Sequence, residues 1–392
     1  MPPLDGRRLW FVGIGGAGLS AYAQLAAAWG AEVGGWDRLR TPYLAAIAGL
    51  PVEISPEPSI PDGWEVVVSS AYPGVPGRSR ADFLAELVGL RRAIVVSGAH
   101  GKSTTSAMIA FALRETGGDP AWLIGATVPQ LGGNAGAGEG WLVVEGDESD
   151  RTAFGLPAEI AVITNVELDH HTEYGSLAEL EAEFDRWSAA AEHAVREAPA
   201  FDGELLLPGE HNRRNAGLAL VALELAGVDR TAAAAALGRF TGTGRRFEVT
   251  EAGGVTIVDD YAHAPAEIAA TIAAAREAYP GRRVRALFQP HLVSRTRHLA
   301  GALGAALAAA DDVIVTDIYL AREDADPDAS GKLVVDALSD RGRLVAWMPA
   351  VEVAVGYLSR RGLPGDVLLV LGAGDIDRAP AMLRDLLAGT AR

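Results

Sequence analysis

Short apolar runs alternate with Ala- and Leu-rich stretches of helical period along almost the whole chain. Each run ends at a polar or glycine-rich loop, which is typical of buried parallel strands. Residues 267–279 and 299–310, between such runs, have the spacing of helices. The alternation predicts an α/β fold in layers, with ligands at the carboxyl ends of the strands. The runs that predict strands lie at residues 8–15, 65–71, 92–99, 140–147, 159–166, 254–261, 284–291, 312–319 and 366–374.

Two changes in this pattern divide the chain into three predicted domains. At residues 90–92 a helical segment gives way to a strand, and at 238–248 a Gly/Thr/Arg loop separates an Ala-rich helix from the next strand. A length of 392 residues suits two or three domains. The predicted domains are residues 1–92, 93–240 and 241–392.

The composition excludes several classes of protein. The chain has no cysteine, which excludes disulfides and thiolate metal sites. It shows no targeting segment and no long uninterrupted apolar run, so we expect a cytoplasmic protein without membrane insertion. A net charge of −17 argues against a nucleic-acid partner, which requires a basic face. It does not argue against nucleotides, whose phosphates a few local cations can bind.

A first glycine-rich loop, Gly13-x-Gly15-x-x-Gly18, lies between a predicted strand and a predicted helix. Asp37 follows at the end of the next strand. This is the pattern of a dinucleotide-binding unit, in which the loop approaches a diphosphate and the acid binds a ribose. The same geometry serves any nucleotide diphosphate, so an NAD-dependent oxidoreductase is one interpretation among several. A turn that binds no ligand is another.

A second glycine-rich loop, "GAHGKSTT", contains Gly98, Gly101, Lys102 and Ser103. The lysine can reach the β- and γ-phosphates of ATP, and the serine hydroxyl can coordinate Mg²⁺. The loop is shorter than the standard P-loop, because position 96 is valine where that spacing requires glycine. A hydride-transfer enzyme has no use for this loop. Two phosphate-binding loops therefore indicate a nucleotide-linked substrate and a separate ATP.

Two acidic segments end strands in the same predicted domain as Lys102. They are "EGDESD", which begins at Glu145, and "TNVELDHH", which ends with His170 and His171. Carboxylates and imidazoles at neighbouring strand ends can complete a Mg²⁺ shell around a triphosphate.

Taken together, the motifs resemble the Mur ligases, the ATP-dependent amide ligases of peptidoglycan precursor synthesis, and most closely those that add L-alanine to UDP-N-acetylmuramate. The resemblance implies three domains: an N-terminal Rossmann-like domain that binds the UDP substrate, a central P-loop ATPase and a C-terminal Rossmann-like domain. It also implies that ATP phosphorylates the muramoyl carboxylate and that the amine of the amino acid attacks the acyl phosphate. We expect a monomer or a weak dimer. The motifs are "GIGGAGLSAYA", "SSAYP", "GAHGKSTT", "EGDESD", "TNVELDHH", "GEHNRRNA", "GTGRRFE", "DDYAHAP", "FQPHLVSRTR" and "GAGDI".

The resemblance assigns roles residue by residue, and it implies no carbamylated lysine. The implied catalytic residues are Lys102, His170, His263 and Arg295. The implied ATP contacts are Gly98, Gly101, Lys102, Ser103, Thr104, Asn215, Arg246 and Asp260, and the implied Mg²⁺ ligands are Ser103, Glu145 and His170. The UDP part would contact Gly13, Gly15, Gly16, Gly18, Asp37 and Ser70, and the amino acid Tyr261, His263, His291 and Arg295.

The chain departs from the family pattern in a few places. The region after "SSAYPG" and residues 173–210 are short, and Ala264 and Leu292 stand where the family commonly has His and Arg. An arginine at 292 would hold the carboxylate of the amino acid through two parallel hydrogen bonds. The acceptor could therefore be another amino acid or a peptide, and an inactive protein that binds the UDP precursor is a further alternative. The general base stays open among His170, His171 and His263.

Overall fold

The computed structural model describes residues 2–167, 174–321, 323–342 and 345–390. The chain forms two compact units, Met1–Leu206 with Arg213–Thr241, and Leu207–Asn212 with Gly242–Arg392. The first unit contains two of the three β-sheets, and the second unit contains the third. The division into domains at residues 92 and 240 stays a prediction. No described helix combines the length and the hydropathy that crossing a bilayer requires.

The first sheet is parallel throughout and has the strand order β3-β2-β1-β4-β5. Phe11 at its centre lies opposite Gly35 on one neighbouring strand and Val67 on the other. The strands are β1 (Arg8–Val12), β2 (Glu32–Asp37), β3 (Val52–Ile54), β4 (Glu65–Val68) and β5 (Arg78–Ser79). The helices are α1 (Ala17–Ala28), η1 (Pro42–Ile47) and α2 (Arg80–Gly89), and the side chain of Ser79 caps α2 by accepting from Asp82 N–H.

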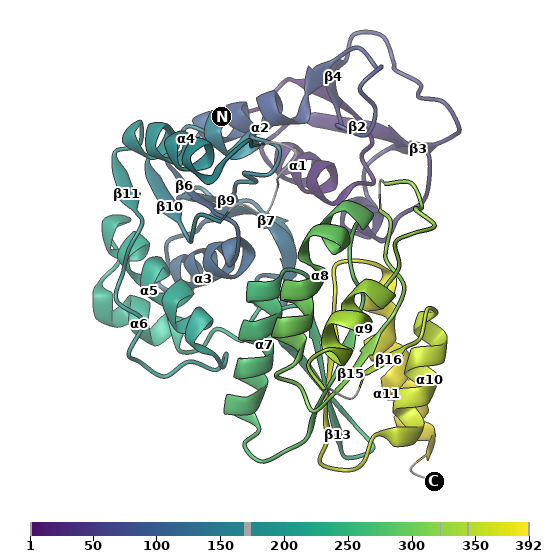
Figure 1. Ribbon diagram of the computed structural model, residues 1–392. Helices are drawn as coiled ribbons and strands as arrows, with labels where there is room; N and C mark the ends of the chain where they lie inside the picture. Colours follow the sequence, from purple (N-terminus) through teal and green to yellow (C-terminus); the bar gives the residue numbers. More distant parts are fainter. Residues whose placement is uncertain (1, 168–173, 322, 343–344, 391–392) are drawn as a thin grey trace. The chain divides into compact units, whose positions relative to one another are not determined.

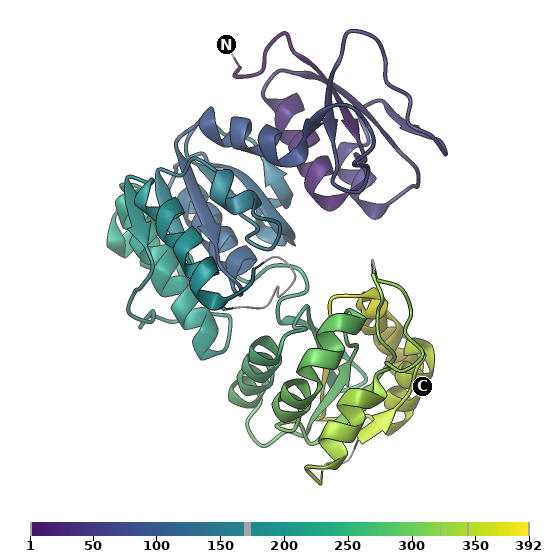
Figure 2. The same ribbon diagram turned by 45° about the horizontal axis from the view of Figure 1, so that its top comes forward.

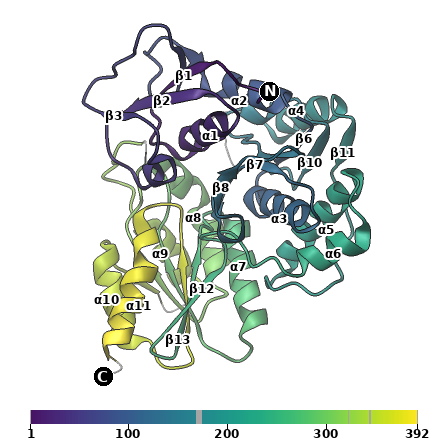
Figure 3. The ribbon, with the colours of Figure 1, turned by 180° about the vertical axis from the view of Figure 1, so that it is seen from behind.

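The second sheet has the order β11-β10-β6-β9-β7-β8. Only the pair β7–β8 is antiparallel (Figure 3). Every residue of β6 is buried, which accounts for the continuous apolar run that precedes the second glycine-rich loop. The strands are β6 (Ala93–Ser97), β7 (Ala121–Val128), β8 (Gly133–Gly136), β9 (Leu142–Glu145), β10 (Ile160–Ile163) and β11 (His193–Val195). The helices are α3 (Lys102–Glu115), η2 (Pro129–Leu131), η3 (Thr152–Gly155), α4 (Leu177–Ala189), α5 (Glu210–Leu225) and α6 (Arg230–Leu237).

The third sheet has the order β12-β13-β17-β14-β15-β16, and β12 pairs antiparallel with β13. All of β17 is buried, and its residues alternate between two hydrophobic clusters. Helices α7 to α9 cover one face of the sheet, and α10 and α11 cover the other (Figures 1 and 2). The strands are β12 (Glu248–Ala252), β13 (Val255–Asp260), β14 (Val284–Phe288), β15 (Asp312–Val315), β16 (Val345–Trp347) and β17 (Val367–Leu371). The helices are α7 (Pro265–Ala278), α8 (Val293–Leu307), α9 (Lys332–Ser339), α10 (Val351–Arg361), η4 (Asp375–Arg378) and α11 (Ala379–Thr390).

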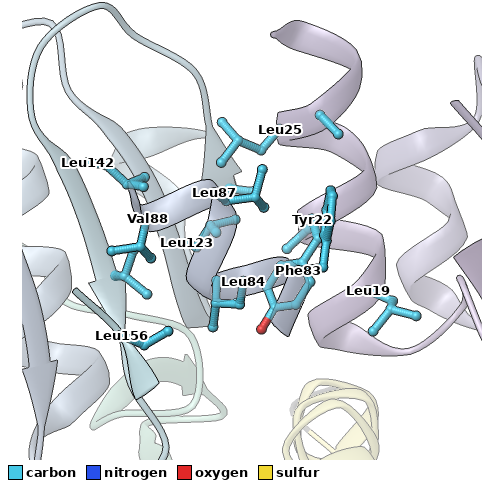
Figure 4. Close-up of a cluster of buried hydrophobic side chains, with 14 of the residues drawn as sticks. Leu19, Tyr22, Leu25, Phe83, Leu84, Leu87, Val88, Leu123, Leu142 and Leu156 are labelled. Atoms are coloured by element: carbon cyan, nitrogen blue, oxygen red, sulfur yellow. The ribbon is translucent and has the colours of Figure 1, made fainter. Parts of the chain in front are cut away.

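One hydrophobic cluster joins the first two sheets (Figure 4). Tyr22 on α1 and Phe83 and Leu87 on α2 lie beside Leu123 and Leu142, which belong to the second sheet. Helix α2 thus connects the two sheets and also packs between them.

The strand predictions are confirmed, since each of the nine apolar runs contains a strand of the structure. The helix predicted at 267–279 is α7. The helix predicted at 299–310 is α8, which begins earlier, at Val293. The sequence pattern missed the start of this helix because the polar stretch "SRTR" shows no apolar period.

We expect Leu87→Ala to destabilise the first unit by about 2–5 kcal/mol, because Leu87 is fully buried in this cluster. Leu90→Ala, at the carboxyl end of the same helix, is the matched control, since Leu90 is 37% exposed. Urea unfolding monitored by tryptophan fluorescence measures both variants. Equal losses in the two variants would contradict the role of the cluster.

Candidate nucleotide and substrate sites

The loop between β6 and α3 has a backbone that requires glycine at two positions. Gly98 has a φ of +132° and Gly101 a φ of +81°. A Cβ at Gly101 would lie 2.5 Å from Asn215 Oδ1, and one at Gly98 would lie 2.6 Å from Asn165 O. The loop therefore packs against α5 and against the segment after β10, and it leads directly into the N-terminus of α3, where backbone N–H groups can bind phosphate.

Lys102 lies at the start of α3, and its ammonium group is held by oxygen atoms. Nζ donates to Gly98 O at 2.7 Å, to Ala99 O at 3.3 Å and to Glu148 Oε2 at 2.8 Å. The Glu148 side chain is only 3% exposed, so this is a buried ion pair. The curled side chain lies over the loop from which it projects.

The electrostatics of this pair favour a charged lysine. Burial lowers the pKa of Lys102, but the carboxylates of Glu148, Asp147 and Glu145 outweigh burial and raise the pKa overall. Burial raises the pKa of Glu148, although the charge of Lys102 opposes this shift. Lys102 therefore carries its positive charge at neutral pH.

Ser103 and Glu145 provide two oxygen ligands next to this charge. Ser103 Oγ donates to Glu145 Oε1 at 2.9 Å, and Glu145 Oε2 accepts from Gly125 N–H at 2.6 Å. A hydroxyl and a carboxylate beside a phosphate-binding loop fit Mg²⁺, which prefers oxygen ligands. His170, the third predicted ligand, lies outside the described residues, as does His171. Within the described ranges, no group of three or more acidic or histidine side chains could hold a metal on its own.

Asn165 fixes the middle of the loop. Its Oδ1 accepts from His100 N–H at 2.9 Å, and its Nδ2 donates to His100 O at 2.8 Å. Thr164 Oγ1 also donates to that carbonyl, at 2.6 Å. The Asn165 amide thus bonds both the N–H and the carbonyl of His100, and it holds the loop against the end of β10.

The first glycine-rich loop, between β1 and α1, is closed by Asp37. Gly15 N–H donates to Asp37 Oδ2 at 2.8 Å, and the Asp37 residue is 7% exposed. Gly13 has a φ of +87°, and a Cβ there would lie 2.8 Å from Ser69 Cβ. Ser70, the predicted contact for the UDP part, is exposed in the turn after β4. Asp37 thus already orders this loop, whatever ligand the loop holds.

Arg80, at the start of α2, lies between the first glycine-rich loop and the acidic segment after β9. Its Nη2 lies 3.0 Å from Asp150 Oδ2, in the acidic segment after β9. Its Nη1 lies 3.7 Å from the position of a Cβ on Gly18, in the first turn of α1. The first loop and the acidic strand end of the second sheet are therefore neighbours within one unit.

In the second unit, an aromatic cluster lies at the carboxyl ends of β13, β14 and β15. Ring centroids are 5.3 Å apart for Tyr261 and His263, and 5.8 Å for His263 and His291. The Tyr319 ring stacks on His291 at 5.8 Å. Arg246 lies over the Tyr261 ring, 5.0 Å from its centroid. The structure thus brings five predicted residues of this unit into one group: Arg246, Tyr261, His263, His291 and Asp260, which is the last residue of β13.

Asp260 has a structural role in this group. Its Oδ2 accepts from Phe247 N–H and its Oδ1 from Ala262 N–H, both at 2.8 Å. Burial raises its pKa, against the nearby charge of Arg246. Asp260 thereby holds the "GTGRRF" loop against the segment that carries Tyr261.

Leu292 and Arg295 lie at the start of α8. Leu292 has a φ of +66°, and its N–H donates to Tyr319 O at 2.9 Å. Arg295 lies in the first turn of the helix and is half-buried.

Sequence reasoning missed several residues that the structure places at these sites: Arg80, Asn165 as a loop anchor, Glu148 as the partner of Lys102, Tyr319 and Glu267. Glu267 had a detectable signal, because it follows His263 by one helical turn. The others depend on contacts between segments far apart in the sequence.

The fold and the lysine-containing loop define an α/β enzyme of the P-loop ligase class. The family model described as "Mur ligase, glutamate ligase domain" matches residues 245–374. The chain is 37% identical to UDP-N-acetylmuramate–L-alanine ligase of Paenarthrobacter aurescens, with 97% of each chain covered. It is 38% identical to the enzyme of the same name from Nocardioides, over 97% of this chain and 96% of that protein.

A solved structure agrees with these relatives. The crystal structure of UDP-N-acetylmuramate–alanine ligase from Thermotoga maritima is 25% identical, covers 98% of this chain and 99% of its own, and superposes with a TM-score of 0.80. The chain belongs to the Mur ligase family. The resemblance and the fold class inferred from the motifs are confirmed.

We expect Gly101→Ala to weaken binding of MgADP by more than tenfold, because the added methyl group would collide with Asn215 and strain a left-handed backbone. Gly117→Ala is a matched control with a φ of +82° and no atom within 4 Å of the added Cβ. It should lose about 1–2 kcal/mol of stability but keep its nucleotide affinity. Isothermal titration calorimetry measures both variants. Equal affinities would contradict the assignment of the loop.

Asp259, on β13, predicts a pH dependence of stability. Burial raises its pKa to about 6, although Arg245 opposes the shift. Because this pKa exceeds the ordinary value of 3.8, the folded protein binds the proton more tightly than the unfolded chain. This stabilisation is complete below about pH 4 and is lost as the pH rises through about 6. We expect wild type to lose about 3 kcal/mol over this range relative to Asp259→Asn, as urea unfolding across pH 4–7 would show. Parallel curves for the two proteins would contradict it.

Proposed function

We propose that the chain is an ATP-dependent ligase that joins L-alanine to UDP-N-acetylmuramate in peptidoglycan precursor synthesis. The observation that carries this proposal is the grouping of a charged Lys102 with Ser103 and Glu145 at the N-terminus of α3. The proposal is also supported by 37% identity, over 97% of this chain, to a UDP-N-acetylmuramate–L-alanine ligase. ATP and UDP-linked sugars are cytoplasmic metabolites, and we propose this compartment.

The chemistry explains why such a grouping is needed. A carboxylate is a poor acylating agent, because oxide is a very poor leaving group. Phosphate is a good leaving group. Transfer of the γ-phosphoryl group to the carboxylate brings two anions together, and preorganised positive charge must offset their repulsion. Lys102 and the N–H groups of α3 supply that charge. Ser103 and Glu145 would hold Mg²⁺, which neutralises phosphate charge when it is bound.

We assign the remaining binding roles to residues that the motifs predicted. Asn215 on α5 lies against Gly101, which supports its proposed contact with ATP. We assign the diphosphate of the UDP substrate to the first glycine-rich loop, where α1 begins next to Arg80. Gly98 and Thr104 are further proposed ATP contacts, and the proposed UDP contacts are Gly13, Gly15, Gly16, Gly18, Asp37 and Ser70.

The acceptor amino acid is assigned to the aromatic cluster of the second unit, around Tyr261, His263 and His291. Arg295 is the proposed partner of its carboxylate, because position 292 is leucine. This replacement also supports a second candidate, a ligase of the same type that takes a different amino acid or a peptide.

Phosphate release tests both candidates. The protein is incubated with ATP, Mg²⁺ and UDP-N-acetylmuramate, together with one amino acid at a time. Release that depends on L-alanine supports the first candidate, and release that depends on another amino acid or peptide supports the second. The absence of release with every acceptor would contradict the ligase.

Lys102→Ala should lower the rate of L-alanine-dependent phosphate release by about a hundredfold or more, because it removes a preorganised charge from the transferred phosphoryl group. The chain has a single other lysine, Lys332, which is exposed at the start of α9. Lys332→Ala is the matched control and should retain wild-type activity. A near-wild-type rate for Lys102→Ala would count against the catalytic assignment.

A further inference from the structure

Glu267 is fixed over the N-terminus of α7. The N-cap residue of this helix is Ala264, which has no side-chain acceptor. Glu267, the third residue of the helix, makes the reverse contact of a capping box, because its Oε2 accepts from His263 N–H at 3.0 Å and from Ala264 N–H at 3.1 Å. The Glu267 side chain is only 11% exposed. This carboxylate is therefore held in one position by the backbone itself.

The same carboxylate oxygen lies beside the imidazole ring of His263. The distance from Oε2 to His263 Nδ1 is 3.2 Å, and Tyr261 O lies 3.1 Å from the same nitrogen. Both neighbours are hydrogen-bond acceptors, so we assign the proton to Nδ1. The other ring nitrogen, Nε2, then carries the lone pair. A carboxylate on Nδ1 fixes the tautomer and the orientation of a histidine that takes a proton at Nε2.

The charges around Glu267 suit this arrangement. Arg246 Nη1 lies 3.7 Å from Glu267 Oε1, the carboxylate oxygen that does not face His263. This positive charge favours an ionised Glu267. An ionised Glu267 stabilises the imidazolium that forms when His263 accepts a proton.

We propose that Glu267 is a positioning residue that holds His263 as the general base for the acceptor amine. This inference rests on the proposed function, because an amino acid reaches a ligase as an ammonium ion and must lose a proton before it can attack. One ammonium proton passes to His263 Nε2, and the nitrogen lone pair forms the C–N bond to the acyl carbon. The C–O bond to phosphate breaks, and phosphate leaves as hydrogen phosphate with the second proton.

Hydroxylamine separates this role from a structural one. It is a neutral nucleophile near pH 7 and attacks an acyl phosphate without prior removal of a proton, giving a hydroxamate and phosphate. A variant impaired only in proton removal therefore loses turnover with the amino acid but retains hydroxamate formation. A variant with a damaged fold or a damaged ATP site loses both.

Glu267→Gln is the test variant, because the amide oxygen can still accept from the two backbone N–H groups while the charge is removed. We expect kcat with L-alanine, or with whichever acceptor the wild type uses, to fall by about 10- to 100-fold. Hydroxamate formation and the KM for ATP should stay within about threefold of wild type. Glu277→Gln, on the exposed face of α7, is the matched control and should change neither rate.

His263→Gln completes the experiment as the second variant. It should show the same separation between the two nucleophiles, and adding Glu267→Gln to it should cause little further loss, because both changes remove one function. Equal loss of both rates in Glu267→Gln would overturn the positioning role, and so would full retention of both. If wild type forms no hydroxamate and releases no phosphate with any acceptor, the proposed function itself fails, and this inference fails with it.

Discussion

The candidate ATP site depends on one buried positive charge. Removing an ammonium ion from water costs several kcal/mol unless oxygen atoms replace its hydration. For Lys102 the replacements are the carbonyls of Gly98 and Ala99 and the carboxylate of Glu148. Those carbonyls can turn toward the lysine because the loop adopts backbone angles open to glycine, and Asn165 and Asn215 hold the loop in that shape. The glycines, the two asparagines and the buried glutamate thus serve one purpose, which is to keep a charged lysine where a phosphate can reach it.

The sequence predicted the parts of this arrangement that are local. Apolar runs predicted nine of the seventeen described strands, and the residues that follow some of these runs suggested the candidate site, because parallel strands end at the same edge of a sheet. The sequence could not predict which partner a polar side chain binds in the folded protein. Asp37 fits the pattern of a ribose ligand, but its carboxylate accepts from Gly15 N–H. Glu148 is one of several acids in "EGDESD", and nothing in their spacing distinguishes the one that pairs with Lys102. Such choices depend on segments that meet only in the folded chain.

Backbone strain in the second unit is concentrated next to the proposed acceptor residues. Arg245, Phe247 and Leu292 have φ angles between +54° and +66°, a region that disfavours side chains by about 1–2 kcal/mol. Each is held by a hydrogen bond from its own N–H: Arg245 to Glu248, Phe247 to Asp260 and Leu292 to Tyr319. Strain of this kind persists only where the surroundings fix the backbone. In this unit it directs the "GTGRRF" loop toward Tyr261 and turns the chain from His291 into α8.

An acidic protein that binds several anions has to place its cations individually. With a net charge of −17, its general electrostatic field repels nucleotides. Three candidate cations are each paired with a neighbouring acid: Lys102 with Glu148, Arg80 with Asp150 and Arg246 with Glu267. An acid of this kind keeps its cation charged and oriented, so the cation is ready before an anion arrives. Such an acid can also contact a second residue of the site. Glu267, for example, lies beside both Arg246 and His263. In this chain the excess of acidic residues is compatible with anion binding because several acids act through a basic neighbour.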